Sequence, residues 1–275
     1  MQGRPVILSI AGYDPSSGAG VTADVKTAAA LSCYATTCIT AMTVQSTRGV
    51  FAVEPVAPRL VADTLKVLAE DLPIAAVRLG MLASGEVAEA VADFLEQQRL
   101  SNVVLDPVIR SSSGAEMIDA AGLEVIRRRL LPLSTVATPN LDEAAWLTES
   151  PAALPGSSWD EQSPHLLALA DKLHLLGATG VVVTGGHLEP PNDLLSYFED
   201  GLRQEQVFRG SRVESHSTHG TGCAFATAIA CGLALGRDLP EAVRTAKAFV
   251  RQAIEAAYPV GKGIGPVNHL FGRQG

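Results

Sequence analysis

Residues 6–31 read VILSIAGYDPSSGAGVTADVKTAAAL and set a pattern that recurs along the chain. The apolar run at 6–10 predicts a strand, a glycine-rich loop follows, and residues 23–31 predict a helix. The loop lacks the G-K-[ST] ending of a P-loop and the G-x-G-x-x-G spacing of a dinucleotide fingerprint. Asp14 in this loop is the type of residue that usually caps a turn. The stretch therefore predicts a strand, a glycine loop and a helix, but neither common nucleotide motif.

Outward from this stretch, short apolar runs alternate with longer segments of helical periodicity. We expect strands at residues 6–10, 36–43, 75–79, 103–105, 136–137 and 181–183. We expect helices at residues 23–31, 59–72, 85–98, 123–131, 166–176, 224–235 and 240–258. Segments 194–198 and 206–208 predict a hairpin at one sheet edge, and the Pro- and Ser-rich residues 150–164 predict a surface loop. The alternation predicts an α/β fold with a central, mostly parallel sheet between two layers of helices, in one domain over residues 1–275.

The composition excludes several classes of protein. Of 275 residues, 47% are hydrophobic and 18% are charged, and the formal net charge is −8. The absence of a basic run argues against a nucleic-acid partner, and no apolar run is long enough to span a membrane. The four cysteines lack zinc-ligand spacing, and the N-terminus enters a strand pattern without a signal-peptide core. We therefore expect free thiols and a cytoplasmic protein.

The strongest chemical signal is STHGTGC at residues 217–223, directly before a predicted helix. Gly220 and Gly222 let the backbone turn tightly, and Thr221 lies between them just before the helix. The N–H groups and dipole of a helix N-terminus favour an anion such as a phosphate. A thiol in the first helical turn has a lowered pKa, so Cys223 is a candidate thiolate. The alternative is a small buried cysteine that only packs.

Further polar residues follow predicted strands, where open α/β sheets bind their ligands. Asp106 ends the strand at 103–105 and precedes a serine-rich loop at residues 110–116. In TPNLDE, at residues 138–143, Asn140 and Glu143 are spaced as a helix capping box. The same pair suits a hydrated Mg²⁺ beside a triphosphate, because Mg²⁺ prefers oxygen ligands and keeps its waters. Both interpretations remain open at this point.

Taken together, these motifs resemble those of hydroxymethylpyrimidine/phosphomethylpyrimidine kinases of the thiamin pathway, in the ribokinase superfamily. AGYDPSSGAG at residues 11–20 is similar to the family's AG-x-DPSGGAG opening, with Ser17 in place of a glycine. TVQST at residues 43–47 is similar to its Gln-Asn-Thr segment, with Ser46 substituted. The family's order is then followed by LGML at 79–82, DPV at 106–108, TPNLDEA at 138–144, GGH at 185–187, STHGTGC at 217–223 and GKGIGPVNH at 261–269. The resemblance covers nearly the whole chain.

The resemblance implies a ribokinase-like fold and ATP-dependent phosphorylation of 4-amino-5-hydroxymethyl-2-methylpyrimidine or its monophosphate, with Mg²⁺ as cofactor. The Gln45 amide suits this substrate, because it offers a donor and an acceptor to an aminopyrimidine edge. Relatives are commonly dimers, so we expect a homodimer. The implied site residues are Gly12, Asp24, Gln45 and Met81 at the pyrimidine, Asp106, Thr184 and Lys247 at the nucleotide, Asn140 and Glu143 at Mg²⁺, and Gly220, Thr221, Gly222 and Cys223 at the anion hole, where Cys223 accepts or orients the hydroxyl proton.

Two departures from the family pattern concern the phosphates. The family's Lys-Gly-Gly-His begins with Thr184 here, and the lid lysine is missing from residues 111–114, where Arg110 is the candidate replacement. One alternative is a pyridoxal or pyridoxine kinase of the same fold, some of which carry a lid cysteine that residues 110–116 lack. The other is a catalytically weak nucleotide- or pyrimidine-binding protein, which Thr184 favours. One or two phosphorylation steps, and a pyridoxal side activity, are both compatible with the sequence.

Overall fold

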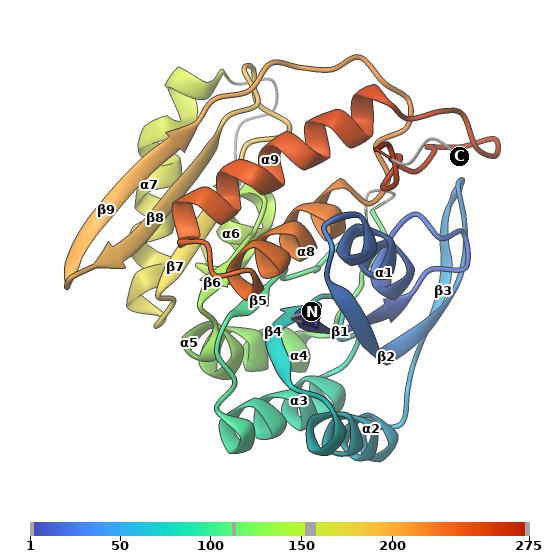
Figure 1. The fold of residues 1–275 in the computed structure, drawn as a ribbon. Helices are drawn as coiled ribbons and strands as arrows, with labels where there is room; N and C mark the ends of the chain where they lie inside the picture. Colours follow the sequence, from blue (N-terminus) through green and yellow to red (C-terminus); the bar gives the residue numbers. More distant parts are fainter. Residues whose placement is uncertain (1–2, 112–113, 152–157, 273–275) are drawn as a thin grey trace.

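The computed structural model describes residues 3–111, 114–151 and 158–272. Within these residues, nine strands form one sheet in the order β3-β2-β1-β4-β5-β6-β7-β8-β9 (Figure 1). The strands are β1 (Val6–Tyr13), β2 (Tyr34–Ser46), β3 (Gly49–Pro55), β4 (Ile74–Leu79), β5 (Val103–Leu105), β6 (Val136–Ala137), β7 (Gly180–Thr184), β8 (Asp193–Glu199) and β9 (Leu202–Phe208). Neighbours from β2 to β7 are parallel, and β3, β8 and β9 pair antiparallel. The predicted mostly parallel sheet with a hairpin at one edge is confirmed.

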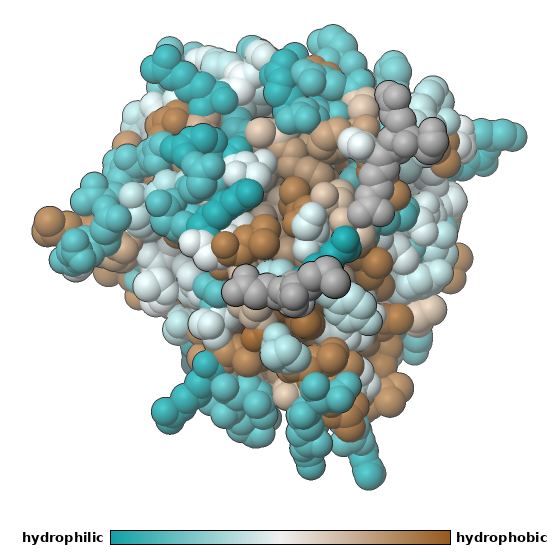
Figure 2. Space-filling view, in the orientation of Figure 1, coloured by the Kyte–Doolittle hydropathy of each residue, from teal (hydrophilic) through white to brown (hydrophobic). Residues whose placement is uncertain are grey.

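Helices cover both faces of the sheet (Figure 1). They are α1 (Gly20–Ala30), α2 (Pro58–Asp71), α3 (Gly85–Gln98), α4 (Ala120–Val125), the π-helix η1 (Ile126–Leu130), α5 (Leu131–Leu133), α6 (Leu141–Leu147), α7 (Trp159–Leu175), α8 (Thr221–Ala234) and α9 (Leu239–Glu255). One core lies between the sheet and the layer that contains α2, α3 and α7, and a second lies under α1, α8 and α9. In the same orientation, Figure 2 shows polar side chains along the outline of the molecule and apolar ones gathered toward its middle.

The central strands owe their burial to continuous apolar runs rather than to alternation. β1 reads VILSIAGY, and every residue but the last is buried, as expected for a strand covered on both faces. The alanine-rich helix α8 is buried on almost every side, because small side chains let it approach α9 and the sheet closely. The ends of β1, β4 and β5 thereby meet the N-terminus of α8.

Some predicted boundaries are wrong for identifiable reasons. β3 was not expected, because most of its side chains are at least partly exposed and its strand conformation comes from pairing with β2. The loop expected over residues 150–164 ends earlier, since α7 begins at Trp159 behind a capping box of Ser158 and Glu161. Pro164 is tolerated in that helix, where the Ser163 hydroxyl donates to the Asp160 carbonyl at 3.2 Å. Residues 152–157 of the expected loop lie outside the described residues.

None of the described helices is both long enough and apolar enough to cross a membrane.

Candidate active site

The loop before α8 has a shape that requires glycine at one position. Gly220 caps the helix N-terminus with φ 85° and ψ 10°, and a Cβ there would lie 1.8 Å from the carbonyl oxygen of Gly18. Both the left-handed conformation and the close approach of another backbone exclude a side chain. Gly222 differs, because among the described residues no atom lies within 4 Å of an added Cβ. Residues 217–223, the predicted anion-binding segment, are called the anion loop from here on. This loop packs against the glycine-rich loop after β1.

Asp14 holds these two loops together. Its carboxylate is 3% exposed and accepts hydrogen bonds from the N–H groups of Ser16 at 2.8 Å, Gly18 at 3.1 Å and Ala19 at 2.9 Å. It also lies 2.8 Å from Nε2 of His219 in the anion loop. Burial raises the pKa of Asp14, but the hydrogen bonds with His219 and Ser16 outweigh it and leave the pKa below its ordinary value. Asp14 therefore does more than cap a local turn.

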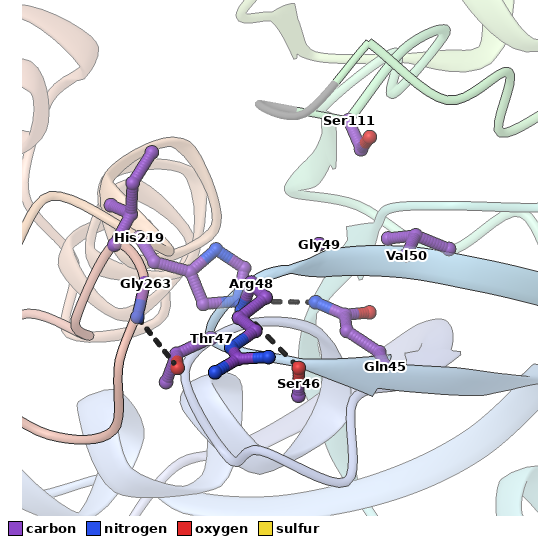
Figure 3. Close-up of a pocket in the computed structure, with 10 residues that line it drawn as sticks. Gln45, Ser46, Thr47, Arg48, Gly49, Val50, Ser111, His219 and Gly263 are labelled. Carbon is purple, nitrogen blue, oxygen red and sulfur yellow. Dashed lines mark hydrogen bonds between the residues drawn. The ribbon is translucent and has the colours of Figure 1, made fainter.

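An open cleft of about 150 Å³ lies beside these loops (Figure 3). Gln45 from β2 and His219 from the loop before α8 point toward each other, with their Nε2 atoms 3.2 Å apart. The Thr43 hydroxyl donates to Oε1 of Gln45 at 3.1 Å. The cleft is lined by residues 45–50, Ser111, His219, Gly263 and Ile264. The Gln45 amide is thus accessible to a pyrimidine ring that enters the cleft.

The other predicted pyrimidine residues are buried. Gly12 packs against Met81, whose Cε lies 2.2 Å from where a Cβ on Gly12 would be, and Met81 is 5% exposed. Asp24 has no exposed surface, and its carboxylate accepts hydrogen bonds from Ser9 Oγ at 2.6 Å and Thr227 Oγ1 at 2.7 Å. Their contribution to pyrimidine binding stays a prediction.

A buried arginine, absent from the candidate residues, lies next to Asp24. Arg78 of β4 has no exposed surface; its Nη2 lies 2.6 Å from Asp106 Oδ2 and its Nη1 lies 3.4 Å from Asp24 Oδ2. Gly80 leaves room for this side chain, because a Cβ there would lie 1.8 Å from Nη1. The sequence did hold a signal for this residue, because Arg78 is the one charged residue in the apolar run at 74–82. Arginine is almost never fully buried unless it is paired, so its place in a central strand indicates a buried ion pair.

Cys223 lies in the first turn of α8, partly buried, beside this ion cluster. Burial is the main reason that the pKa of its thiol rises to about 11; attraction to Arg78 opposes the rise, and repulsion from Asp106 and Asp24 adds to it. The predicted lowering of this pKa is therefore wrong. The helix dipole favours a thiolate, but removal from water and two nearby carboxylates outweigh it.

The predicted Mg²⁺ residues form the capping box of α6. Asn140 Oδ1 accepts from the N–H of Glu143 at 2.9 Å, and Glu143 Oε2 accepts from the N–H of Asn140 at 2.9 Å. Glu143 is 6% exposed; burial raises its pKa to about 8, and repulsion from Asp106 adds to the rise. The capping interpretation is confirmed. Over the described part of the chain, no group of three or more His, Cys, Asp or Glu side chains is placed to hold a metal ion, and the Mg²⁺ role stays a prediction.

Thr184, at the end of β7, lies beside Asn140. Lys247 of α9 is linked to Thr184 through Asp193 of β8. Thr184 forms a bridge with Asn140, and its N–H donates to the Pro139 carbonyl at 2.9 Å. Asp193 pairs with Thr184 across β7 and β8, and its Oδ2 lies 2.6 Å from Lys247 Nζ. The charge of Lys247 is therefore balanced by a buried carboxylate, and its predicted contact with the nucleotide requires that the ion pair open or be shared.

The sheet, the glycine-rich loop after β1 and the anion loop that packs against it at the N-terminus of α8 define a small-molecule kinase with a ribokinase-like fold. The family model described as phosphomethylpyrimidine kinase matches residues 14–268. The chain therefore belongs to the phosphomethylpyrimidine kinase family.

Individual proteins give the same picture. A hydroxymethylpyrimidine/phosphomethylpyrimidine kinase of Streptomyces coelicolor is 41% identical over 265 residues, 96% of this chain and 94% of that protein. The thiamine biosynthesis bifunctional protein ThiED of Geobacter sulfurreducens is 41% identical over 98% of this chain, which spans 53% of that longer protein. Among solved structures, an ADP complex of Bacillus subtilis pyridoxal kinase has a TM-score of 0.84 and 31% identity, with 97% of both chains covered.

Proposed function

We propose that the protein transfers the γ-phosphate of ATP to the 5-hydroxymethyl group of 4-amino-5-hydroxymethyl-2-methylpyrimidine, or to the phosphate of its monophosphate. One observation carries this proposal: His219 lines the cleft beside Gln45, and the next residue, Gly220, caps the N-terminus of α8. A pyrimidine bound at Gln45 therefore has its substituent close to a helix terminus suited to a phosphoryl group. The Streptomyces relative bears the name of this activity, and the Bacillus structure holds ADP on the same fold.

The chemistry follows from these positions. In the first reaction the substrate hydroxyl loses its proton to Cys223 Sγ and its oxygen attacks the γ-phosphorus, and the bond from that phosphorus to the ADP oxygen breaks as ADP leaves with the electron pair. The N–H groups in the first turn of α8 stabilise the charge on the transferring group. A thiol with a pKa of about 11 holds its proton at neutral pH, so Cys223 must ionise first. The Gly20 N–H and Arg78 favour the ionised form.

We assign Mg²⁺ to the N-terminal end of α6, beside Asn140 and Glu143. Asn140 Oδ1 and Glu143 Oε2 already accept capping hydrogen bonds, so water-mediated contacts suit them better than direct ligation. Mg²⁺ readily keeps part of its water shell, which fits this donor set. When bound, the ion neutralises charge on the triphosphate. The residues of this chain hold and orient it.

Product analysis tests the proposed function. The purified protein is incubated with Mg-ATP and, separately, with the hydroxymethylpyrimidine, its monophosphate and pyridoxal, and phosphorylated products are identified by mass spectrometry. We expect product from one or both pyrimidines. Phosphorylation of pyridoxal alone would instead support a pyridoxal kinase. That activity has less support, because the chain is 31% identical to the Bacillus pyridoxal kinase but 41% identical to the Streptomyces hydroxymethylpyrimidine/phosphomethylpyrimidine kinase. ADP release without any product would leave a weak nucleotide-binding protein.

Gln45→Ala should raise the KM for the pyrimidine by about 5- to 150-fold, which corresponds to losing a hydrogen-bonding partner worth about 1–3 kcal/mol. The reason is that the Gln45 amide faces the cleft between Thr43 and His219. The KM for ATP should change much less. Gln45→Met is the matched control, because it keeps the volume and removes the amide, and it should behave like the alanine variant. An unchanged pyrimidine KM in both variants would rule out base recognition by Gln45.

Thr184→Lys should lower the KM for ATP by about fivefold, as expected for a charged contact worth about 1 kcal/mol. The position lies beside Asn140 at the nucleotide end of the site, and threonine adds no charge there. Steady-state kinetics with varied ATP measure the effect, and Thr184→Met controls for side-chain length. If the KM for ATP stays the same or rises, the missing charge is supplied elsewhere. Arg110, whose guanidinium lies 4.9 Å from the Trp146 ring centroid on α6, is then the next residue to replace.

We also propose that the protein is a homodimer that pairs through the outer face of β2 and β3. Met42, Val44 and Phe51 on these paired strands are 46%, 63% and 68% exposed, so a second copy of the chain could bury them together. Light scattering should give a dimer for the wild type and a monomer for Val44→Lys combined with Phe51→Lys. A monomeric wild type at micromolar concentration would contradict this assignment.

A further inference from the structure

Four ionisable side chains from four parts of the chain meet beneath the anion loop. Arg78 comes from β4, Asp24 from α1, Asp106 from the segment after β5, and Cys223 from the first turn of α8. Arg78 is the central member, because it contacts both carboxylates and interacts electrostatically with the thiol. The cluster thus connects Asp106, a predicted nucleotide-binding residue, to Cys223, the residue proposed to take the substrate proton.

The guanidinium is paired but not fully hydrogen-bonded. Nη2 donates to Asp106 at 2.6 Å, whereas Nε and Nη1 have no hydrogen-bond partner among the described residues. Nη1 lies 3.4 Å from Asp24, whose two carboxylate oxygens already accept from Ser9 and Thr227. A buried guanidinium with unused donors stabilises any further anion that forms beside it.

The net charge of the cluster explains why the Nε and Nη1 donors of Arg78 matter for a thiolate at Cys223. With both carboxylates ionised, Arg78 supplies the single positive charge against two negative charges, before Cys223 loses its proton. The charged groups that act on the thiol are Asp24 from α1, Arg78 from β4 and Asp106 after β5. A thiolate here is therefore opposed by two of its neighbours and favoured by one.

We propose that Arg78 is a positioning residue for phosphoryl transfer: it holds Asp106 and Cys223 in register beneath the anion loop and supplies the positive charge against which the Cys223 thiolate forms. The inference rests on the proposed role of Cys223 as proton acceptor. Arg78 itself is fully buried and acts on the reaction through these two residues. Its fork geometry bridges groups from two elements, which a lysine does less well.

Alkylation of Cys223 measures its ionisation without requiring turnover. The rate of iodoacetamide labelling, followed at the Cys223 peptide by mass spectrometry, is recorded against pH for the wild type, Arg78→Gln and Asp24→Asn. At pH 9, Arg78→Gln should be labelled at least tenfold more slowly, because one pKa unit changes the thiolate fraction tenfold. Asp24→Asn should be labelled faster, by about tenfold, because it removes a repelling charge. Opposite directions are not expected from a general loosening of the fold.

Arg78→Lys separates charge from geometry and guards against misfolding of the glutamine variant. It should recover most of the labelling rate but keep a lowered kcat, since a lysine cannot bridge Asp106 and the thiol side together. Labelling profiles of Arg78→Gln and Asp24→Asn that match the wild type, or that shift in the same direction, would overturn the proposal. The role of Cys223 as proton acceptor fails separately, if Cys223→Ala retains wild-type kcat, and the proposed function fails if product analysis finds no phosphorylated pyrimidine. In either case the labelling profiles still decide whether Arg78 controls the thiol.

Discussion

Replacing Cys223 by alanine is expected to lower kcat by about 10²–10⁴-fold, the usual contribution of a positioned proton acceptor. The thiol lies in the first turn of α8, next to the Gly20 N–H and beside the buried Arg78, so the variant removes the group proposed to take the substrate proton. Removing the side chain creates little free space, and the fold and the KM for ATP should change little. Single-turnover kinetics with the pyrimidine substrate measure the chemical step directly.

Cys231→Ala is the matched control for the loss of a thiol from α8. Cys231 is fully buried two turns further along the helix, packed in the core under α8 and α9. It should cost at most about 1 kcal/mol of stability through lost packing and leave kcat unchanged. If Cys223→Ala keeps wild-type kcat, the helix N-terminus stabilises the transferring phosphate without a protein base, and Asp106 or solvent takes the proton.

Gly220→Ala is expected to lower kcat by about 10²–10³-fold, the range seen when an oxyanion-type hydrogen-bond donor is lost. It should also reduce the melting temperature by several degrees. An alanine at φ 85° costs about 1–2 kcal/mol, and its Cβ would lie 1.8 Å from the Gly18 carbonyl oxygen. The two loops must then separate, which displaces the N–H groups at the start of α8. Thermal unfolding and steady-state kinetics measure the two effects.

Two other glycines, one in the first turn of α8 and one beyond its C-terminal end, isolate the causes. Gly236, just after α8, also has a positive φ, of 80°, but an added Cβ there meets no described atom within 4 Å. Gly236→Ala should therefore lose stability through strain alone and keep its activity. Gly222→Ala has neither positive φ nor a clash and should keep its melting temperature. A Gly220→Ala variant with the activity of Gly236→Ala would show that the interlocked loops do not position the anion site.

Local patterns in the sequence were sufficient for most of the fold. The continuous apolar runs identified β5 and β6 to the residue, and helical periodicity identified α3 in the same way, because each depends on neighbours within a few positions. The capping box of Asn140 and Glu143 is equally local, and it was one of the two interpretations that the sequence left open for this pair. β3 has no such pattern, since its conformation depends on pairing with β2, and so it could not be found.

The motifs, in their order, identified the family, and Gln45 and Gly220 were predicted at positions where the tertiary structure gives them a cleft and a close backbone contact. Other residues could not be judged from their neighbours in the sequence. Asp14 was taken for a turn residue, although it also reaches His219, 205 positions away. Arg78 was overlooked, although it connects β4 to α1 and to the segment after β5.

The ionisation of Cys223 shows where this limit lies. Its place at the start of a helix is a local property, and from it the sequence alone predicted a lowered thiol pKa. The tertiary structure decided the opposite, because burial weakens the hydration of the thiol and because Asp24 and Asp106 approach it from distant parts of the chain. Strands, caps and family motifs depend on neighbours along the chain, whereas the charge state of a buried group depends on everything folded around it.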